Sequence, residues 1–430
     1  MLPALPPEPL GLGVDLGTSG IRLALINPAG SVVVELDAAY PLAFDQPAGW
    51  LAGLRGLCAR LTAPQRAAVA AVAIDGTSGT LLLCRSDGAL APGELARALP
   101  YHQACPEHAA EAAALLGDEA KHTAAASASG SVARALHLLR KAGTWPQAQG
   151  WLLRHQADWL MGWLLADWRW GEEGNNVRLG WDLQRQCWQG QLLEQPWHMA
   201  LPEICPSGHC LGRLAPQASQ MLGLPDTAVV VAGSTDASAA VLAADLQPGD
   251  GVTVLGTTLV LKQFSDRPLQ GPGVSCQKVA GRWLVGGASN AGAGVLRRFF
   301  NDDQLQELSR QIDPRRPTGL DFLPLPRPGE RFPVDDPALE PRLEPRPVSD
   351  ALYLQALLEG LTEIEAAGWQ RLQALGAPKV QRLISLGGGA HNPQWRALRQ
   401  RRLGMPVLNR PQCTAARGMA KLALSSVGLR

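Results

Sequence analysis

The chain has 430 residues, of which 46% are hydrophobic and 18% are charged, and its formal net charge is +1 at pH 7. This length predicts two domains, and this composition excludes a disordered chain. The near-zero net charge provides no electrostatic footprint for nucleic acid or an anionic membrane, so we expect neither as a partner.

The sequence shows no pattern of a targeting signal, and its cysteines are typical of reduced thiols, so we predict a cytoplasmic protein. Residues 1–10 lack a basic region followed by a long apolar segment, which argues against a signal peptide. No run of about 18 or more apolar residues predicts a transmembrane helix. The eight cysteines are scattered, as is typical of reduced thiols. Cys205, His209 and Cys210 cluster without a second ligand pair at zinc-site spacing, so we interpret them as structural.

The first motif along the chain is the glycine-rich stretch GVDLGTSGIRLAL at residues 13–25. Its glycines lack the spacing of a dinucleotide-binding loop, and the chain contains no Gly-Lys-Ser or Gly-Lys-Thr of a nucleotide P-loop. Residues 21–26 and 31–36 have strand patterns, and residues 27–30 have a turn pattern. We therefore predict a strand–turn–strand hairpin whose backbone N–H groups form an anion-binding concavity.

Residues 228–244 predict a strand that leads into a helix. The strand is AVVVA at residues 228–232, the helix covers residues 237–244, and Asp236 stands at the corner between them. A side chain at such a corner can project into a cleft. The alternative role is a helix N-cap, which aspartate favours and which the local sequence alone supports better.

An internal echo relates the two halves of the chain. Residues 253–258 (TVLGTT) repeat the pattern of residues 14–19 (VDLGTS), and residues 246–251 ahead of the second copy have the turn composition of a domain connection. We expect two similar α/β halves that close on one ligand, each offering a hairpin to a polyphosphate. Asp15 corresponds to Val254, so one half alone supplies a carboxylate suited to magnesium. The alternative for Asp15 is a purely local role in the turn.

Near the carboxy terminus, residues 382–386 predict a strand, and Gly387, Gly388 and Gly389 follow it. Three consecutive glycines leave no side chain to block a flat ring, so a nucleoside could lie against this backbone. A flexible loop is the competing interpretation.

In this order, these segments resemble the FGGY family of carbohydrate kinases, which belongs to the sugar kinase, Hsp70 and actin group of ATPases. The resemblance extends from about residue 11 to about residue 422, and it includes the proline-rich residues 325–333 and the small-residue stretch 414–420. It implies an α/β, ribonuclease H-like fold of two domains, residues 1–243 and 244–430, with an ATP cleft between them.

Within the family, the DGTSGT turn at residues 75–80 is similar to that of ribulose kinases, particularly the short D-ribulose kinases of cyanobacteria and plastids. The stretches HQADWL at residues 155–160 and LGWD at residues 179–182 are similar to the same branch. Many family members carry a sugar-contacting W-x-D-x-R motif, but residues 101–105 read YHQAC and lack both charged residues. The acidic residue common at the start of the family's closing helix is also missing, since residues 412–414 read QCT.

The resemblance implies that ATP phosphorylates the terminal hydroxyl of a ketopentose, best matched by D-ribulose, with D-xylulose or another polyol as the alternative. Asp236 would be the general base, and Asp15 would hold Mg²⁺, through water. The sugar would contact Asp15, Thr18, Ser19, Gly20, Ser78 and Asp236. ATP would contact Gly17, Thr18, Gly256, Thr257, Thr258, Gly388, Gly389 and Asn392.

Two non-enzymatic hypotheses remain beside the kinase: an actin- or Hsp70-like ATPase module, and a sugar sensor. Asp236 and the turn at residues 75–80 favour a kinase, because a kinase needs a base and a polyol pocket. No helix-turn-helix pattern precedes the first hairpin, which argues against a repressor. The expected partners are a small sugar and ATP, and the sequence leaves the choice between monomer and homodimer open.

Overall fold

The computed structural model describes residues 8–118, 120, 123–143, 145–146, 148 and 150–429, so most of the stretch inspected for a signal peptide lies outside the described residues. The chain divides into two compact units. Unit 1 comprises Met1–Ala243, Lys278–Gly281 and Thr414–Arg430, and unit 2 comprises Ala244–Gln277 and Arg282–Cys413. Among the described helices, none is long and apolar enough to cross a membrane.

Unit 1 is built on a mixed six-stranded sheet in the order β11-β12-β4-β1-β2-β3. Its strands are β1 (Leu10–Leu16), β2 (Gly20–Ile26), β3 (Val32–Ala39), β4 (Val69–Gly76), β11 (Cys210–Arg213) and β12 (Val229–Thr235). β2 pairs antiparallel with both β1 and β3, and the pair of β2 with β3 confirms the hairpin predicted over residues 21–36. β4 and β12 join parallel to β1, so these three strands end at the same edge of the sheet. Their nearly continuous apolar sequences fit a sheet that is covered on both faces.

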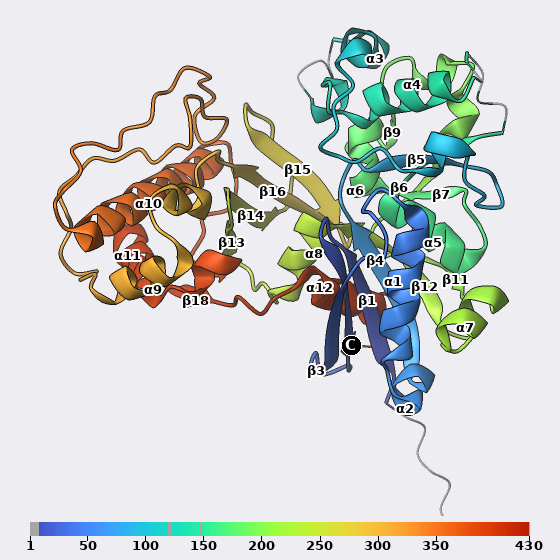
Figure 1. Cartoon of the computed structure of the whole chain (residues 1–430), viewed down its shortest axis with the longest axis horizontal. Helices are drawn as coiled ribbons and strands as arrows, with labels where there is room; N and C mark the ends of the chain where they lie inside the picture. Colours follow the sequence, from blue (N-terminus) through green and yellow to red (C-terminus); the bar gives the residue numbers. More distant parts are fainter. Residues whose placement is uncertain are drawn as a thin grey trace, which may run out of the picture. The chain divides into compact units, whose positions relative to one another are not determined.

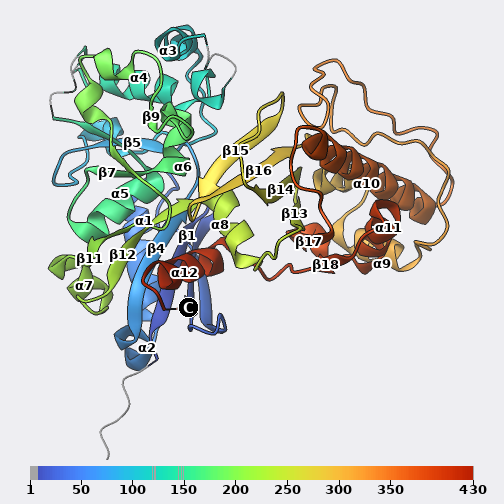
Figure 2. The same ribbon diagram turned by 180° about the vertical axis from the view of Figure 1, so that it is seen from behind.

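Helices cover the two faces of this sheet (Figures 1 and 2). On one face, α1 (Pro47–Ala59) and α5 (Gln156–Leu165) pack against the large apolar residues of β1, such as Leu12 and Val14. On the other face, α8 (Asp236–Ala243) and α12 (Ala415–Ser426) pack against small residues such as Ala71 and Ala73. The alternation LGLGV in β1 creates this difference, because successive side chains of a strand point to opposite faces.

The position of α12 corrects the predicted domain boundary. A Cβ on Gly13 would lie 1.9 Å from Ala416 O, and a Cβ on Gly11 would lie 2.4 Å from Ala420 O, so α12 rests directly on the backbone of β1. The segment Thr414–Arg430 therefore belongs to unit 1, although the sequence analysis assigned all of residues 244–430 to one domain. The glycines that admit this helix lie some 400 residues upstream, so their role was invisible in the local pattern.

The rest of unit 1 forms smaller layers around this sheet. Its helices are α2 (Ala63–Ala67), α3 (Ala109–Leu116), α4 (Ser131–Lys141), α6 (Glu173–Asn176) and α7 (Pro216–Leu222). Its short strands pair as β5 (Leu81–Cys84) with β6 (Leu152–His155), β7 (Trp170–Glu172) with β10 (Glu203–Cys205), and β8 (Trp181–Asp182) with β9 (Cys187–Trp188). α3 and α4 share a separate apolar core with β5 and β6.

Five neighbouring strands of unit 2 repeat the strand order of unit 1, and the sixth strand lies at the opposite edge. Its sheet runs β15-β16-β14-β13-β17-β18, with β13 (Asp250–Leu255), β14 (Leu259–Ser265), β15 (Val274–Val279), β16 (Arg282–Ala288), β17 (Arg382–Leu386) and β18 (Val407–Asn409). β13 pairs antiparallel with β14 and parallel with β17, as β1 pairs with β2 and β4. The helices are α9 (Asp302–Arg310), α10 (Asp350–Ala374) and α11 (Pro393–Leu403). The internal echo in the sequence is thus confirmed as a repeated topology.

Candidate functional site

The carboxyl ends of β1, β4 and β12 bring three aspartates to one edge of the unit 1 sheet. Asp15 pairs with Asp75 across β1 and β4, and Asp75 pairs with Ser234 of β12. Directly paired residues point to the same face, so the Asp15 and Asp75 side chains are neighbours. Asp236 follows β12 as the first residue of α8. The edge where parallel strands end is the usual ligand site of open α/β sheets.

Two carboxylates of this acidic cluster are buried, and the exposed Arg22 provides a neighbouring cation. Asp15 is 4% exposed and Asp75 is fully buried. Arg22 Nη1 donates to Asp15 Oδ2 at 2.8 Å, whereas neither Asp75 oxygen has a hydrogen-bond partner among the described residues. Burial, followed by the charges of Asp15 and Asp236, raises the pKa of Asp75 well above its usual value. Unpartnered carboxylate oxygens beside Asp15 are hard oxygen donors, so the cluster fits a Mg²⁺ ion.

Asp236 occupies the predicted strand-to-helix corner. Its Oδ1 accepts a hydrogen bond from the N–H of Ala237 at 2.7 Å, a contact one residue ahead of the positions that a capping side chain usually serves. Burial raises the pKa of Asp236 to about 6; the charge of Asp15 also raises it, while the Ala237 N–H and Arg178 lower it. A carboxylate with this pKa is mostly ionised at neutral pH and is basic enough to accept a proton.

Arg178 belongs to this site, and the sequence analysis missed it. Arg178 lies in the 3₁₀ turn Val177–Leu179 and directly precedes the LGWD stretch at residues 179–182, which is similar to that of ribulose kinases. A Cβ built on Gly79 would lie 3.1 Å from Arg178 Cδ, so the arginine packs against the turn that contains Ser78. The charge of Asp236 raises the pKa of Arg178, although burial lowers it more. The site therefore contains a second guanidinium near the candidate base.

The turn between β1 and β2 presents the residues assigned to sugar and phosphate. Thr18 and Ser19 are exposed, and Gly17 is half-buried. Tyr40 donates its hydroxyl to Gly17 O at 2.9 Å, and Thr18 Oγ1 lies 3.4 Å from the hydroxyl of Tyr101. The two tyrosines hold the turn while its small polar side chains stay accessible.

Gly20, the remaining residue of this turn, has a packing role of its own. It is the first residue of β2, where a Cβ would lie 2.4 Å from Ala38 O of the neighbouring strand. Close approach of two strands therefore explains this glycine without a ligand. Its contact with a sugar stays a prediction.

Ser78 lies in a tightly held turn after β4. Thr77 donates its hydroxyl and its N–H to Gln156 Oε1, at 2.8 and 3.1 Å. Thr77 Oγ1 also lies 2.7 Å from Thr80 Oγ1, which accepts the N–H of Tyr101 at 3.2 Å. Gln156 begins α5, so the HQADWL stretch supplies the support for the DGTSGT turn. Ser78 itself is half-buried within this frame.

Arg134 of α4 supports the segment that lacks the W-x-D-x-R charges. Its Nε donates to Gln103 O at 3.0 Å, and its Nη2 donates to Tyr101 O. Arg134 is fully buried, and burial lowers its pKa to about 10. A guanidinium thus reaches this segment from a helix outside the motif, which no reading of residues 101–105 could reveal.

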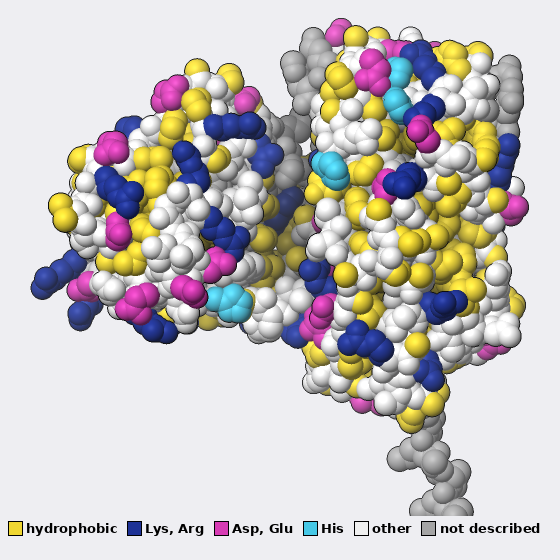
Figure 3. All heavy atoms as spheres, in the orientation of Figure 1, with side chains coloured by type: hydrophobic (Ala, Val, Ile, Leu, Met, Phe, Trp, Pro, Cys, Tyr) yellow, Lys and Arg dark blue, Asp and Glu magenta, His cyan; other side chains and the backbone are white. Residues whose placement is uncertain are grey.

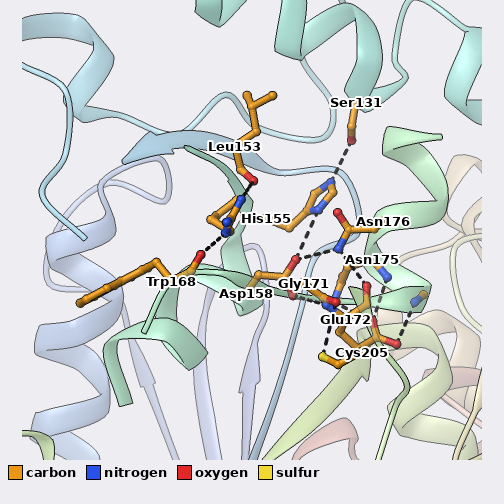
Figure 4. Close-up of polar contacts among 12 residues, drawn as sticks. Ser131, Leu153, His155, Asp158, Trp168, Gly171, Glu172, Asn175, Asn176 and Cys205 are labelled. Atoms are coloured by element: carbon orange, nitrogen blue, oxygen red, sulfur yellow. Dashed lines mark hydrogen bonds and ion pairs between the residues drawn. The ribbon is translucent and has the colours of Figure 1, made fainter. Parts of the chain in front are cut away.

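A buried polar network ends at β12 (Figure 4). Glu172, the final residue of β7, accepts the N–H groups of Gly174 and Asn175 at 2.8 Å each. Asn175 Nδ2 donates to Glu172 Oε2 at 3.0 Å and to Ser234 O at 3.4 Å. Because Ser234 precedes Asp236 by two residues, the network supports the strand end that carries the candidate base.

The same network extends to α4. Asp158 Oδ1 accepts the N–H of Glu172, and Asp158 Oδ2 accepts Asn176 Nδ2, both at 3.0 Å. His155 Nδ1 lies 3.6 Å from Asp158 Oδ2, and its Nε2 lies 3.1 Å from Ser131 Oγ. These residues are buried, so their mutual hydrogen bonds fix the local geometry strongly.

Unit 2 contains a cavity of about 770 Å³ where β13 and β17 end. This volume lies in the usual range of small-molecule and cofactor sites. Five of the predicted ATP contacts lie in its wall: Gly256, Thr257, Gly388, Gly389 and Asn392. The wall does not include Thr258, whose carbonyl accepts the N–H of Gly256 at 3.2 Å. All the predicted ATP contacts of unit 2 except Thr258 thus converge on one cavity.

The structure requires glycine at two of the three positions after β17, for different reasons. Gly387 has φ of 82°, a conformation that favours glycine. A Cβ on Gly389 would lie 2.6 Å from Trp395 Cζ3, whereas a Cβ on Gly388 would meet nothing within 4 Å. Neither the backbone nor internal packing therefore requires glycine at Gly388, in the wall of the cavity.

Asn392 lines the cavity, but its amide already has partners. Asn392 Oδ1 accepts the N–H of Trp395 at 3.0 Å and caps α11, and its Nδ2 donates to Ser309 Oγ at 2.9 Å. The structure thus gives Asn392 a capping role that shapes the wall. The sequence predicts that Asn392 contacts adenosine, and the cap is a feature that the structure adds.

Residues 251–427 match the sequence model described as the FGGY family of carbohydrate kinases, C-terminal domain. This part of the chain is therefore similar in sequence to an FGGY carbohydrate kinase domain. The matched FGGY region contains β17, all of β13 except its first residue, the cavity and every unit 2 residue predicted to bind ATP. The aspartates of unit 1 lie upstream of the matched region.

Solved structures are similar to the chain over nearly its whole length. A xyloylose kinase from Brucella ovis is 21% identical with a TM-score of 0.82, covering 97% of this chain and 91% of that one. A xylulose kinase from Rhodospirillum rubrum is 20% identical with a TM-score of 0.81, covering 97% and 90%. A Plasmodium falciparum glycerol kinase with ADP is 14% identical with a TM-score of 0.81, covering 98% and 90%. These likenesses confirm the predicted α/β two-domain sugar kinase fold.

The cysteine–histidine cluster considered in the sequence lies upstream of the matched FGGY region. Cys205 is buried and its Sγ donates to Gly171 O at 3.4 Å, whereas Cys210 is exposed and its Sγ donates to Ser426 O at 3.2 Å. The two thiols thus have separate carbonyl partners, in keeping with their structural interpretation.

Proposed function

We propose that this chain is an ATP-dependent sugar kinase that phosphorylates the terminal hydroxyl of a ketopentose, D-ribulose. One observation carries the proposal: Asp236, with a pKa raised to about 6, stands beside the buried Asp15 and Asp75 at the edge of a sugar kinase sheet. A phosphoryl transfer to an alcohol needs one proton acceptor and a site for cationic charge, and this cluster offers both.

In the proposed reaction, Asp236 accepts the proton of the sugar's terminal hydroxyl while that oxygen attacks the γ-phosphorus of ATP. The bond between the γ-phosphorus and its bridging oxygen breaks, and ADP leaves. Thr18 and Ser19 offer hydroxyls to the sugar or to the transferring phosphoryl group, and Ser78 offers its hydroxyl to the sugar. Arg178 lies near the base and can bind a sugar oxygen.

Asp15 and Asp75 would hold Mg²⁺ in this scheme, with Asp15 acting through water. When bound, the ion neutralises charge on the phosphate oxygens. Arg22 keeps the Asp15 carboxylate oriented through the 2.8 Å contact. The proton transfer itself involves Asp236 and not the metal ligands.

The proposed nucleotide site is the cavity of unit 2. Gly256 and Thr257 would meet the phosphates, and Gly388 and Gly389 would lie against the adenosine. Eight free thiols and the use of ATP both fit a cytoplasmic enzyme, which we propose for this chain.

Gly388→Val should raise KM for ATP about tenfold or more without lowering the melting temperature. A Cβ at Gly388 clashes with no protein atom, so added methyl groups occupy space that the nucleotide needs. Gly56→Val is the matched control, because Gly56 also has open space around its Cβ but lies on α1. Steady-state kinetics with varied ATP measure the effect. An unchanged KM in Gly388→Val would show that adenosine does not bind against this loop.

The substrate assignment predicts that kcat/KM is highest for D-ribulose in a panel with D-xylulose, L-ribulose and glycerol. D-xylulose differs from D-ribulose in configuration at C3 alone, so discrimination between the two sugars must come from this one hydroxyl. A site that hydrogen-bonds a particular hydroxyl can reject a sugar in which that hydroxyl is mispaired. ADP release, measured on one preparation, gives all four values. A tenfold preference for D-xylulose or glycerol would overturn the ribulose assignment and leave the kinase intact.

The same assay separates the non-enzymatic alternatives. A sugar sensor would bind a sugar without sugar-dependent ADP release, and an Hsp70-like ATPase would release ADP at a rate independent of any sugar. Either result would overturn the kinase proposal itself.

A further inference from the structure

Three metal-ligating side chains meet in the layer formed by α3 and α4. Cys105 and Glu107 stand at the 3₁₀ turn Pro106–His108, and His137 lies on α4. The ligand atoms of Cys105, Glu107 and His137 all lie within 4.8 Å of one another. Histidine and charged side chains gather on the surface over α3 and α4 in Figure 3. This group lies outside the proposed catalytic site.

Direct contacts within the group connect Glu107 to two histidines. Glu107 Oε1 lies 3.0 Å from His137 Nδ1 and 3.7 Å from Nε2 of His108. Arg140 Nη1 lies 3.1 Å from Nδ1 of His108, and an arginine can only donate, so that nitrogen accepts and Nε2 carries the proton. The Glu107 carboxylate thus stands between two imidazoles and beside a thiol.

We propose that Cys105 Sγ, the Glu107 carboxylate and His137 Nδ1 bind one Zn²⁺ ion, with water at the fourth position. A thiolate, an imidazole and a carboxylate are the ligand types that zinc uses, and the thiolate disfavours magnesium and calcium. Three protein ligands from a turn and a helix, with one position open, make a half-buried site rather than a closed one.

The charges around the group are compatible with a cation. Glu111 and Glu107 flank Arg140 and His137, and Glu111 Oε2 pairs with Arg140 Nη2 at 2.8 Å. Its own backbone N–H and His137 lower the pKa of Glu107, so its carboxylate is ionised. Burial lowers the pKa of His108, which keeps that ring neutral.

The thiol is the group that zinc must ionise. Burial and the charge of Glu107 raise the pKa of Cys105, and the charge of Arg134 opposes them. Zinc binding releases the Cys105 proton to solvent, because the thiolate is the form that binds the metal.

A bound ion would join the segment 101–105 to α4. Arg134 of α4 already donates to the carbonyls of Tyr101 and Gln103, and the Tyr101 hydroxyl lies 3.4 Å from Thr18 Oγ1. Zinc would add a second connection from the same helix at the end of this segment. It would therefore stiffen the wall that holds Tyr101 in place.

The experiment uses the full chain, stripped with a chelator and titrated with Zn²⁺ and, separately, with Co²⁺. We expect one tight zinc per chain, a rise in melting temperature on binding, and a thiolate-to-cobalt charge-transfer band in the near ultraviolet. Cys105→Ser should remove this band, and His137→Gln, on a partly exposed helix position, should weaken zinc binding at least about a hundredfold, since even outer-shell changes cost 10–100-fold. The double variant Cys187→Ser/Cys210→Ser removes the two exposed thiols as the matched control.

The charge-transfer band distinguishes this site from the aspartate cluster. That cluster has no thiolate, so cobalt bound there would not produce the band. Retention of the band in Cys105→Ser, or its loss in the Cys187→Ser/Cys210→Ser control, would overturn the proposal. The proposal would also be overturned if His137→Gln and Cys105→Ser both bound zinc as tightly as the wild-type chain does. None of these readouts depends on kinase activity, so the proposed function stands or falls separately.

Discussion

Replacing Asp236 by asparagine is expected to lower kcat for sugar phosphorylation by about 10² or more, with ATP affinity nearly unchanged. Asparagine keeps the size of the side chain and an oxygen that accepts from the Ala237 N–H, but it cannot take a proton. The cavity proposed to bind ATP does not include Asp236 in its wall. Steady-state kinetics with varied sugar, and direct titration with ATP, measure the two effects separately.

Thermal stability distinguishes a lost base from a damaged fold. Burial raises the pKa of Asp236 from 3.8 to about 6. The folded state therefore binds this proton more tightly than the unfolded state does, which stabilises the fold at low pH. This contribution to stability is lost as the pH rises through the interval. Asp236→Asn avoids this loss, and in metal-free buffer it should melt above the wild type at about pH 7.5, with the difference vanishing below about pH 4. The wild-type kcat should fall as the pH drops below about 6. Near-normal turnover in the variant would reduce Asp236 to a structural residue of α8.

Asp15→Ala should lower Mg²⁺-dependent turnover by at least about 10², whereas Val254→Ala should cost only packing, about 1 kcal/mol of unfolding free energy. The two residues occupy the same position in the repeated hairpin. Asp15 has Arg22 and Asp75 beside it in the sheet, and the loss of its carboxylate would remove a proposed metal ligand. Activity measured against Mg²⁺ concentration, together with melting curves, gives both numbers.

The comparison is informative because the two variants remove equivalent side chains from equivalent strands. Both must first melt cooperatively, which excludes misfolding as the cause of lost activity. If the two folded variants lost activity equally, Asp15 would have no special role, and the acidic cluster would be a structural feature of the sheet.

Short-range pattern was enough to predict the hairpins and the strand at residues 382–386, because turn residues and apolar runs are local signals. β13, β14 and β17 lie where these signals place them. The sequence also showed Asp15 against Val254. The structure extends this difference, since Arg22 and Asp75 correspond to Val260 and Leu386 in unit 2.

Residues that act across long sequence distances escaped prediction. Asp75 was visible within the DGTSGT turn, but its place beside Asp15 depends on parallel pairing of strands some 60 residues apart. Arg178 and Arg134 reach the site from a turn and a helix whose own sequences carry no kinase motif. The Asn392 side chain could be predicted to line a nucleotide loop, yet the cap that it forms became clear only once α11 was seen to begin there.

The contact between α12 and β1 has a consequence for biosynthesis. Arg417 Nε donates to Glu35 Oε2 at 2.7 Å across 382 residues of sequence, and α12 covers the glycine face of β1. Apart from Lys278–Gly281, unit 2 is continuous, so it can fold on the ribosome before α12 is translated. Unit 1 must instead wait, with the glycine face of β1 uncovered, for a helix encoded after the whole of unit 2. Nascent unit 1 is therefore the part of this protein most in need of a chaperone.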